Sequence, residues 1–502
     1  MNIPNYVARN ARKYTRREAV VAYEPTGVSR RSWGELNIHV NQFAHYLQHE
    51  HGIDDGDRVA LFLPNTYAFV VAHFAVQRLG AIVVPVNVRL ATPELAYILE
   101  NSGARLVVTC KLTDAAVKPL QEQGVQALWL DDVNAMLDGL PAREINCDSD
   151  AEDPCTLLYT SGTTGKPKGV LFNHSALLHV GMMFAVEMKY QPESRLLSLM
   201  PFTHSAPLNL ELIGGTLIGC THVIAPTFTP DLLLDLTEKE RTTHFFGAPV
   251  AYLLTAQHPS IQGRDLSSTT HWIYGGGPMA PEHAKLAQAA FKSEQFYCVY
   301  GLTEAGPTGT LLLPHEHAEK AGACGKRAAV FTEVRLVDDF NNPVGDNEPG
   351  EMQITGEGLM LEYWQNPEAT AELFTEDGWI RTGDIAVRDE DGFYWIKDRM
   401  KDLIISGGVN VYPREIEDAL ATHPAVLEAA VIGIPHPEWG ESVKACVVLK
   451  TELANPQEAL KAHLQPLLAD YKIPRHIEVM AELPHNANGK VLKHVLRKQQ
   501  SQ

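Results

Sequence analysis

Residues 58–109 have the sequence RVALFLPNTYAFVVAHFAVQRLGAIVVPVNVRLATPELAYILENSGARLVVT. Apolar runs predict strands at 58–63, 81–86 and 105–109, and helical patterns predict helices between them at 66–79 and 93–102. Further apolar strands are predicted at 195–200, 221–225, 243–246 and 270–274. Strands that alternate with helices indicate parallel-type sheets packed with helices on both faces. The sequence therefore predicts an α/β fold.

The pattern changes in the last third of the chain. From Gly325 to Lys397 the predicted strands are shorter and separated by turn signals, which indicates a β-rich, mostly antiparallel section. Residues 389–392, DEDG, partly match a calcium-binding loop, but the other ligands are absent and a hairpin turn is predicted instead. Beyond residue 400 we expect strands at 403–406, 429–434 and 442–449, and helices at 413–421 and 456–468. The prediction is a large N-terminal domain, residues 1–400, and a small, mobile C-terminal α+β domain, residues 401–502.

Composition excludes several classes of protein. The 502 residues carry a formal net charge of −19, which argues against a dedicated nucleic-acid-binding protein. Seven scattered cysteines without a Cys-x-x-Cys pattern indicate reduced thiols rather than a disulfide framework or a zinc site. No signal-peptide pattern and no transmembrane segment are predicted, so we expect a cytoplasmic protein. The oligomeric state stays open, with a homodimer among the options.

Residues 159–169, YTSGTTGKPKG, concentrate hydroxyl, glycine and lysine residues after a predicted strand. Hydroxyls and backbone N–H groups donate hydrogen bonds, and glycine lets the backbone approach an anion closely. The segment is not a Walker A loop, because Gly165-Lys166 is followed by proline instead of Ser or Thr. A polyphosphate site is predicted at Thr160, Ser161, Gly162, Thr163, Thr164, Gly165, Lys166 and Lys168.

In order and spacing this segment resembles the phosphate loop of the adenylate-forming superfamily, which includes acyl-CoA synthetases, firefly-type luciferases and peptide-synthetase adenylation domains. A second segment, Tyr300-Gly301-Leu302-Thr303-Glu304, is similar to that superfamily's next signature. The resemblance implies that Tyr300 stacks on adenine, that Thr303 binds the α-phosphate and that Glu304 binds Mg²⁺. An aromatic face suits a purine, and a hard oxygen ligand suits magnesium that bridges phosphates.

Three further segments extend the resemblance. Gly275, Gly276 and Gly277 follow an apolar strand and would line the adenine and acyl pockets, although by themselves they also fit a turn. His204 would border the acyl carboxylate and gate the pocket. Asp384, with Arg399 downstream, would clamp the ribose of the nucleotide, because a carboxylate can accept hydrogen bonds from both ribose hydroxyls.

The C-terminal motifs complete the pattern. Lys490, in PHNANGKVL, matches the superfamily's catalytic lysine, whose ammonium would lie between the substrate carboxylate and the α-phosphate. Lys401 stands where the family has its hinge. Gly407 and Gly408 would face the pantetheine arm of coenzyme A, and Trp439 would lie near the coenzyme A entrance.

The resemblance extends from Tyr159 to Lys490 and implies an ATP-dependent, Mg²⁺-dependent acid–thiol ligase, most similar to bacterial acyl-CoA synthetases. Its substrates would be ATP, coenzyme A and a small carboxylic acid. The segments expected to line the acyl pocket are apolar, aromatic or small, which favours a medium- or long-chain fatty acid, with an aryl or cinnamoyl-type acid as the alternative. Two other hypotheses are an inactive homologue that binds acyl-adenylate or coenzyme A, and a luciferase-type oxidation.

Overall fold

The computed structural model describes residues 2–160, 166–277, 279–406, 409–436, 439–485 and 491–499. These residues form two compact units, each described here by itself. The first consists of Met1–Thr160, Pro167–Val334 and Ile354–Ile380, and the second mainly of Arg335–Gln353 and Arg381–Gln502. In the described ranges, no helix has the length and apolar character that crossing a membrane requires.

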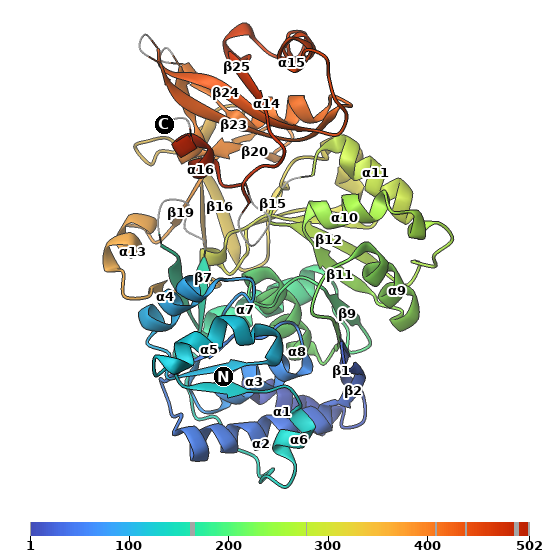
Figure 1. Ribbon diagram of the computed structural model, residues 1–502, viewed down its shortest axis with the longest axis vertical. Helices are drawn as coiled ribbons and strands as arrows, with labels where there is room; N and C mark the ends of the chain where they lie inside the picture. Colours follow the sequence, from blue (N-terminus) through green and yellow to red (C-terminus); the bar gives the residue numbers. More distant parts are fainter. Residues whose placement is uncertain are drawn as a thin grey trace. The chain divides into compact units, whose positions relative to one another are not determined.

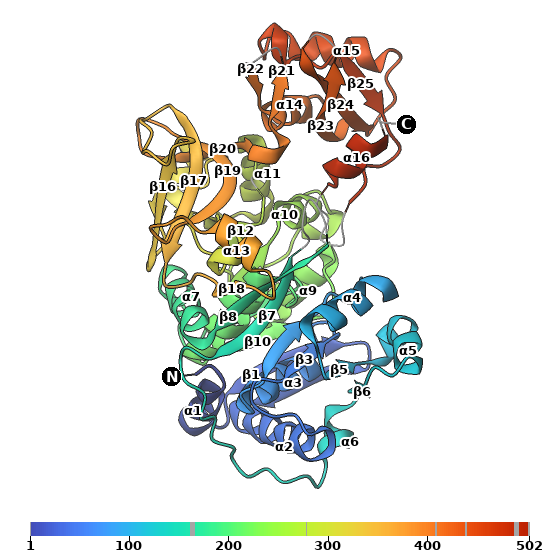
Figure 2. The same cartoon turned by 90° about the vertical axis from the view of Figure 1, so that its left-hand side faces the viewer.

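The first unit contains two large mixed sheets; Figure 1 labels strands of the first, and Figure 2 labels strands of the second. The first sheet has the strand order β15-β14-β13-β12-β11-β9-β10-β1-β2. Its strands are β1 Glu18–Glu24, β2 Gly27–Ser32, β9 Arg195–Ser198, β10 Thr221–Ile224, β11 His244–Gly247, β12 His271–Gly275, β13 Phe296–Val299, β14 Thr310–Leu312 and β15 Arg327–Ala328. The central strands are parallel, as the apolar runs separated by helices predicted.

The second sheet has the order β18-β8-β7-β4-β3-β5-β6. Its strands are β3 Arg58–Leu61, β4 Ile82–Pro85, β5 Leu106–Thr109, β6 Ala127–Trp129, β7 Pro154–Thr160, β8 Lys168–Asn173 and β18 Glu362–Tyr363. Strands β3 to β6 pair in parallel, and β7 pairs in parallel with β4, whereas β8 pairs antiparallel with both β7 and β18. Strands β7 and β8, consecutive in the chain, are therefore antiparallel neighbours.

Helices cover these sheets. They are α1 Pro4–Lys13, α2 Trp33–His51, α3 Tyr67–Arg78, α4 Thr92–Ser102, α5 Asp114–Glu122, α6 Val133–Leu137, α7 His174–Glu187, α8 Gly214–Ile218, α9 Pro230–Glu240, α10 Pro249–Ala256, α11 Pro281–Phe291, α12 His317–Lys320 and α13 Pro367–Leu373, with a π-helix, η2, at Ala206–Ile213. Helices α2 and α3 pack against each other, α2 also contacts β1 and α3 contacts β3. One apolar core joins these helices to strands of both sheets.

The second unit contains two smaller sheets (Figure 2). The third sheet has the order β16-β17-β19-β20, with β16 Thr332–Val337, β17 Pro349–Gly356, β19 Ile380–Arg388 and β20 Tyr394–Arg399. The fourth contains β21 Ile404–Ser406, β22 Val409–Val411, β23 Val426–His436, β24 Gly440–Leu449 and β25 His476–Val479. Helices α14 Pro413–Ala421 and α15 Pro456–Leu464 pack on this sheet, and α16 Lys493–Gln499 packs on β23. Residues 389–392 form the predicted hairpin turn between β19 and β20.

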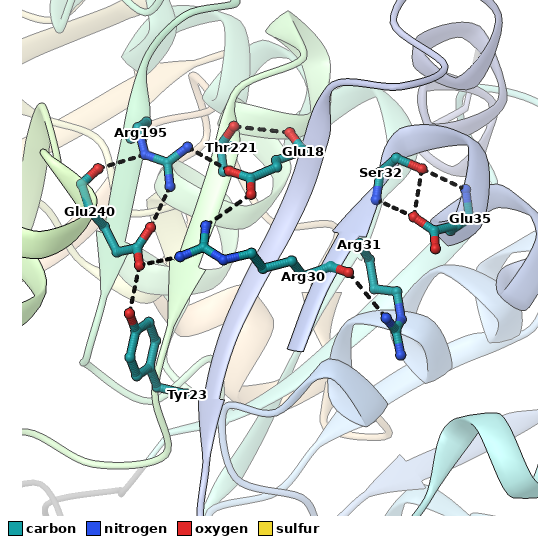
Figure 3. Close-up of polar contacts among 9 residues, drawn as sticks. All are labelled: Glu18, Tyr23, Arg30, Arg31, Ser32, Glu35, Arg195, Thr221 and Glu240. Carbon is teal, nitrogen blue, oxygen red and sulfur yellow. Dashed lines mark hydrogen bonds and ion pairs between the residues drawn. The ribbon is translucent and has the colours of Figure 1, made fainter. Parts of the chain in front are cut away.

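A network of charged side chains around the buried Glu240 joins β1, β2 and β9 to the end of α9 (Figure 3). The carboxylate of Glu240 lies 2.7 Å from Arg195 Nη2 and 2.6 Å from Arg30 Nη2. It also accepts a hydrogen bond of 2.5 Å from the Tyr23 hydroxyl. Glu18 pairs with the same two arginines at 2.8 Å. The side chain of Glu240 is only 3% exposed, so these contacts compensate a charge that water does not reach.

We expect Glu240→Ala to destabilise the first unit by roughly 3 kcal/mol, because the variant removes a buried carboxylate and leaves half-buried Arg195 and the more exposed Arg30 without their shared partner. Denaturant unfolding of the whole protein measures the loss. Glu144→Ala is the matched control, since Glu144 pairs with Arg12 at 3.1 Å while both side chains are well exposed. That control should cost less than about 1 kcal/mol. Equal losses in the two variants would contradict the assigned role of Glu240.

Candidate functional site

The phosphate-loop motif is held at both ends by paired strands. Thr160 is the last residue of β7 and pairs with Lys168, the first residue of β8. The Thr160 hydroxyl donates to the Lys168 carbonyl at 3.4 Å. Lys166 is exposed. The other predicted residues of this motif, Ser161, Gly162, Thr163, Thr164 and Gly165, lie outside the described residues.

Tyr363 connects the first motif to the second. Its hydroxyl donates to Glu304 Oε1 at 2.6 Å, and Lys168 Nζ lies 4.7 Å from the centroid of its ring. Burial first, and the Glu304 carboxylate second, raise the pKa of Tyr363 far above its usual value, so the hydroxyl keeps its proton. β18 brings Tyr363 here by pairing with Val170 on β8. Tyr363 therefore contacts both Lys168 of the first motif and Glu304 of the second.

Thr303 belongs to a second contact between distant segments. Its hydroxyl lies 3.1 Å from that of Ser205, immediately before the π-helix η2. Asn209 on η2 donates to the Gly306 carbonyl at 3.3 Å. Short π-helical segments occur often at functional sites. Here η2 fixes the segment that begins at His204 against the Thr303–Gly306 turn.

His204 carries no charge at neutral pH. Burial lowers the pKa of its imidazole to about 4, and Arg89 contributes in the same direction. A neutral imidazole can donate or accept a hydrogen bond, but it cannot neutralise a substrate carboxylate. A neutral His204 could still border a pocket and donate a hydrogen bond there, without contributing a positive charge.

At two positions in the predicted nucleotide motifs, nearby backbone atoms leave no room for a side chain, so only glycine fits. A Cβ on Gly275 would lie 2.7 Å from the Val299 carbonyl oxygen, and one on Gly301 would lie 2.6 Å from the Pro307 carbonyl. Both residues stand at the carboxyl ends of parallel strands, β12 and β13, the edge at which α/β sheets bind ligands. Gly276 and Gly277 follow Gly275 directly, and half-buried Tyr300 precedes Gly301.

In the second unit, Asp384 and Arg399 face each other across the β19–β20 pair. Arg399 Nε lies 2.6 Å from Asp384 Oδ1, and Arg399 Nη1 donates to the Thr382 carbonyl at 3.2 Å. A pocket of about 460 Å³ lies beside them, lined by Thr382, Gly383, Arg399, Met400 and Lys401. The carboxylate and the guanidinium predicted to clamp a ribose are therefore one ion pair, and the guanidinium borders a pocket.

The remaining C-terminal residues fall into two groups. Lys401 is exposed in a single helical turn, η6 Met400–Asp402. Trp439 is half-buried between the ring of His436, 4.7 Å away, and the guanidinium of Arg475, 3.3 Å from its centroid. Gly407, Gly408 and Lys490 lie outside the described residues.

The donor set suits a magnesium ion held mainly by phosphates. Among the described residues, no group of three or more His, Cys, Asp or Glu side chains could hold a metal ion. Magnesium that bridges phosphates needs only one or two carboxylates from the protein. Glu304 fits this requirement, because a carboxylate has about four acceptor positions and Tyr363 uses only part of that capacity.

Sequence motifs did not identify Tyr363, Ser205 or Asn209. Tyr363 is 59 residues away from Glu304 in the chain and belongs to no recognised pattern. The one sequence signal in this region was the aromatic pair Tyr363-Trp364 followed by a proline three residues later, which many loops share.

Comparison with known proteins agrees with this arrangement. The model of the AMP-binding enzyme family matches residues 7–364, and that of the AMP-binding enzyme C-terminal domain matches residues 415–490. Feruloyl-CoA synthase from an Amycolatopsis species is 37% identical over 468 residues, which cover 93% of each chain. Long-chain-fatty-acid–CoA ligase FadD13 from Mycobacterium tuberculosis is 36% identical over 484 residues, 95% of each chain.

A solved structure shows the same fold. The anthranilate CoA ligase AuaEII, in complex with anthranoyl-AMP, superposes with a TM-score of 0.90 at 26% identity, over 99% of this chain and 97% of the other. Together with the two family models, these similarities assign the fold and the enzyme class. The chain belongs to the AMP-binding enzyme family, among its AMP-forming acyl-CoA synthetases.

Proposed function

We propose that this protein joins a carboxylic acid to coenzyme A through an acyl-adenylate, with ATP as the activating substrate. The observation that carries the proposal is the contact of Tyr363 with both Glu304 and Lys168, which unites the phosphate-loop motif and the second motif. The anthranoyl-AMP held by a similar ligase supports an adenylate intermediate.

In the first half-reaction, the substrate carboxylate attacks the α-phosphorus of ATP and pyrophosphate leaves. The hydroxyls and lysines from Thr160 to Lys168 would hold the β- and γ-phosphates, and Thr303 the α-phosphate. Lys490 would donate to the oxygens of the carboxylate and α-phosphate as negative charge gathers between them. Tyr300 would stack on the adenine beside Gly275, Gly276 and Gly277, while Asp384 and Arg399 hold the ribose.

Glu304 would hold Mg²⁺ with the phosphates, and Tyr363 would keep the carboxylate in place for it. When bound, the ion would neutralise charge on the phosphates, which is the main catalytic requirement of such transfers.

In the second half-reaction, the thiol of coenzyme A attacks the acyl carbon and AMP leaves with the bridging oxygen. We propose that residues 401–502 turn about Lys401 between the half-reactions, relative to residues 1–400. The turn would withdraw Lys490 and bring Gly407 and Gly408 to the pantetheine arm, with Trp439 near the coenzyme A entrance. A short exposed turn at Lys401 is the kind of segment that absorbs such a backbone change.

For the acid we propose a medium- or long-chain fatty acid, with an aryl or cinnamoyl-type acid as the alternative. Phe202 and Phe246, from segments expected to line the pocket, are buried. Glu211 on η2 is also buried, and burial raises the pKa of its carboxyl to about 8, although Ser198 and the Phe246 N–H act in the opposite direction. A carboxyl with a raised pKa is a poor anionic partner for an α-ammonium group, which disfavours an amino-acid substrate.

A panel of acids tests this proposal. Pyrophosphate release should depend on the added acid, and thioester should form only with coenzyme A present. Saturated fatty acids of increasing length, cinnamate and ferulate distinguish the two substrate classes. Absence of release with every acid would refute the ligase assignment, and kcat/KM highest for the aryl acids would select the alternative substrate class.

Loss of the Tyr363 hydroxyl should weaken magnesium binding. We expect Tyr363→Phe to raise the Mg²⁺ concentration for half-maximal activity by about 10-fold, because partners that orient a ligand typically contribute that much or more. Tyr67→Phe is the control, since its hydroxyl pairs with the ring of His39 at 2.8 Å, outside the predicted motifs and without touching Glu304. An unchanged Mg²⁺ dependence in Tyr363→Phe would exclude this role.

A further inference from the structure

The chain leaves the first sheet at the carboxyl end of β9 and continues through residues 199–205 into the π-helix η2. In the sheet, β9 lies between β10 and β11, although both follow it in the sequence. Such a point, where the strand order reverses, is where α/β sheets bind ligands, outside the carboxyl ends of the strands. The attachment of residues 199–213 to neighbouring elements therefore determines the geometry at a position that suits substrate binding.

One buried amide holds the first part of this segment. Asn65 follows β3 of the second sheet and is 3% exposed. Its Nδ2 donates to the Met200 carbonyl at 2.8 Å, and its Oδ1 accepts the Phe202 N–H at 2.9 Å. Because one amide supplies both a donor and an acceptor, it pairs with this main chain as a neighbouring strand would. The ring of Phe202 also packs on that of Phe69 in α3, with 5.5 Å between the centroids.

The second part of the segment is held on two different faces of η2. Asn209 Nδ2 donates to the Gly306 carbonyl at 3.3 Å, and Glu211 Oε1 accepts the Phe246 N–H at 3.3 Å. Both side chains are buried. Residues two apart in a helix do not share a face. The helix η2 is therefore fixed between the turn that ends at Gly306 and the strand β11.

His204 lies between these two attachments. Its N–H donates to the Pro201 carbonyl at 3.0 Å, and its own carbonyl accepts the Leu208 N–H at 3.1 Å. The hydroxyl of the next residue, Ser205, lies 3.1 Å from that of Thr303. His204 thus takes its position from the segment as a whole, and a shift at either attachment moves it relative to Thr303.

We propose that Asn65 and Asn209 are positioning residues for adenylation. They hold His204 at a fixed distance from Thr303. The inference rests on the proposed function, in which His204 borders the carboxylate of the acid and Thr303 binds the α-phosphate. Reacting atoms must approach to about 3–3.5 Å, and a displacement of about 1 Å lowers the rate by about 10²-fold. Each asparagine acts through the main chain that it holds and not through the substrate.

Asn65→Leu tests the first attachment. Leucine has about the size of asparagine, but it removes the donor to Met200 and the acceptor for the Phe202 N–H. In the full-length protein we expect kcat/KM for the acid, measured as pyrophosphate release, to fall by about 10- to 100-fold. KM for ATP should change by less than about 2-fold, because this attachment holds the segment that borders the acid and not the nucleotide.

Asn65→Asp is the conservative variant. A protonated carboxyl has one donor and an acceptor, so it can replace the amide at Met200 and Phe202, whereas an ionised carboxylate accepts only. Burial favours the protonated form. We expect Asn65→Asp to recover most of kcat/KM for the acid, and to recover most completely at low pH. A variant no more active than Asn65→Leu at the lowest pH tested would contradict the role of these hydrogen bonds.

Asn209→Leu tests the second attachment and leaves the contacts of Asn65 intact, so it decides the proposal if Asn65→Leu does not fold. It removes the donor to the Gly306 carbonyl. Because the turn that ends at Gly306 contains Thr303 and Glu304, we expect kcat for ATP–pyrophosphate exchange to fall by about 10-fold, in addition to a higher KM for the acid. An effect on kcat here, but mainly on KM for the acid in Asn65→Leu, distinguishes positioning from a general loss of folded protein.

Asn2→Leu is the matched control. Asn2 is also 3% exposed, and its Nδ2 donates to the carbonyls of Cys147 and Ser149 at 3.0 Å. These bonds lie outside residues 199–213 and outside the predicted motifs. We expect a loss of thermal stability similar to that of Asn65→Leu, while kcat/KM for the acid stays within about 2-fold of wild type.

The outcomes separate this inference from the proposed function. If the wild-type protein releases no pyrophosphate with any acid, the proposed function fails. If the wild type is active and both Asn65→Leu and Asn209→Leu keep its kinetic constants, the positioning role fails. It fails equally if the two variants lose activity only in proportion to their folded fraction, as the control does.

Discussion

Lys490→Ala is expected to lose adenylation and keep thioester formation. Carboxylate-dependent ATP–pyrophosphate exchange should fall by about 10²- to 10³-fold, the usual effect of removing one preorganised group that stabilises developing charge. Thioester formation from pre-made acyl-adenylate should continue near the wild-type rate, because in the proposed cycle Lys490 has left the nucleotide by then. Both rates are measured on one preparation. Their ratio shows whether Lys490 acts in adenylation alone or in both half-reactions.

Lys450→Ala is the control for this variant. Lys450 is an exposed lysine just after β24, so its removal changes the net charge equally without touching the motifs. Both half-reactions should be unaffected. If Lys490→Ala slows the two half-reactions by the same factor, Lys490 does not act selectively and the alternation about Lys401 loses its support.

Glu304→Gln is the second variant with a large expected effect. The amide keeps the size of the side chain but loses the anionic oxygens that magnesium prefers. We expect pyrophosphate exchange to fall by about 10²-fold at any practical Mg²⁺ concentration. Because Tyr363 can still donate to the amide oxygen, the fold should be retained, and thermal unfolding checks this.

Glu362→Gln separates a metal effect from a general loss of charge. Glu362 is exposed and immediately precedes Tyr363 on β18, so it is close in the chain to the same contact. Its substitution should leave the Mg²⁺ dependence unchanged. A Glu304→Gln enzyme that saturates at the wild-type Mg²⁺ concentration would show that Glu304 is not the metal ligand.

The sequence predicted the parts of the fold that local patterns determine. The apolar run 81–86 is the buried strand β4 Ile82–Pro85, and the predicted helix 413–421 is α14. Both follow from hydrophobic periodicity, with proline at the first turn of the helix. The predicted helix 456–468 ends earlier, at Leu464, because the last residues form separate turns. Element boundaries depend on tertiary contacts that periodicity does not contain.

The candidate site could be predicted only where it lies in contiguous motifs. Tyr363 reaches Glu304 because β18 pairs with β8, and no local pattern predicts the register of a two-residue strand. No local pattern predicts the ion pair between Lys493 and Glu417 either, because it forms through the packing of α16 on the fourth sheet. Such contacts depend on strand pairing and helix docking between residues far apart in the chain.

An isotope-transfer experiment shows whether the acid is activated as an adenylate. The enzyme is incubated with ATP, coenzyme A and a substrate acid whose carboxylate oxygens are both labelled with heavy oxygen. Attack of the carboxylate on the α-phosphorus followed by thiolysis must leave one labelled oxygen in AMP. We expect AMP to carry the label in an amount equal to that of the thioester formed. Label in pyrophosphate or phosphate, with unlabelled AMP, would contradict it.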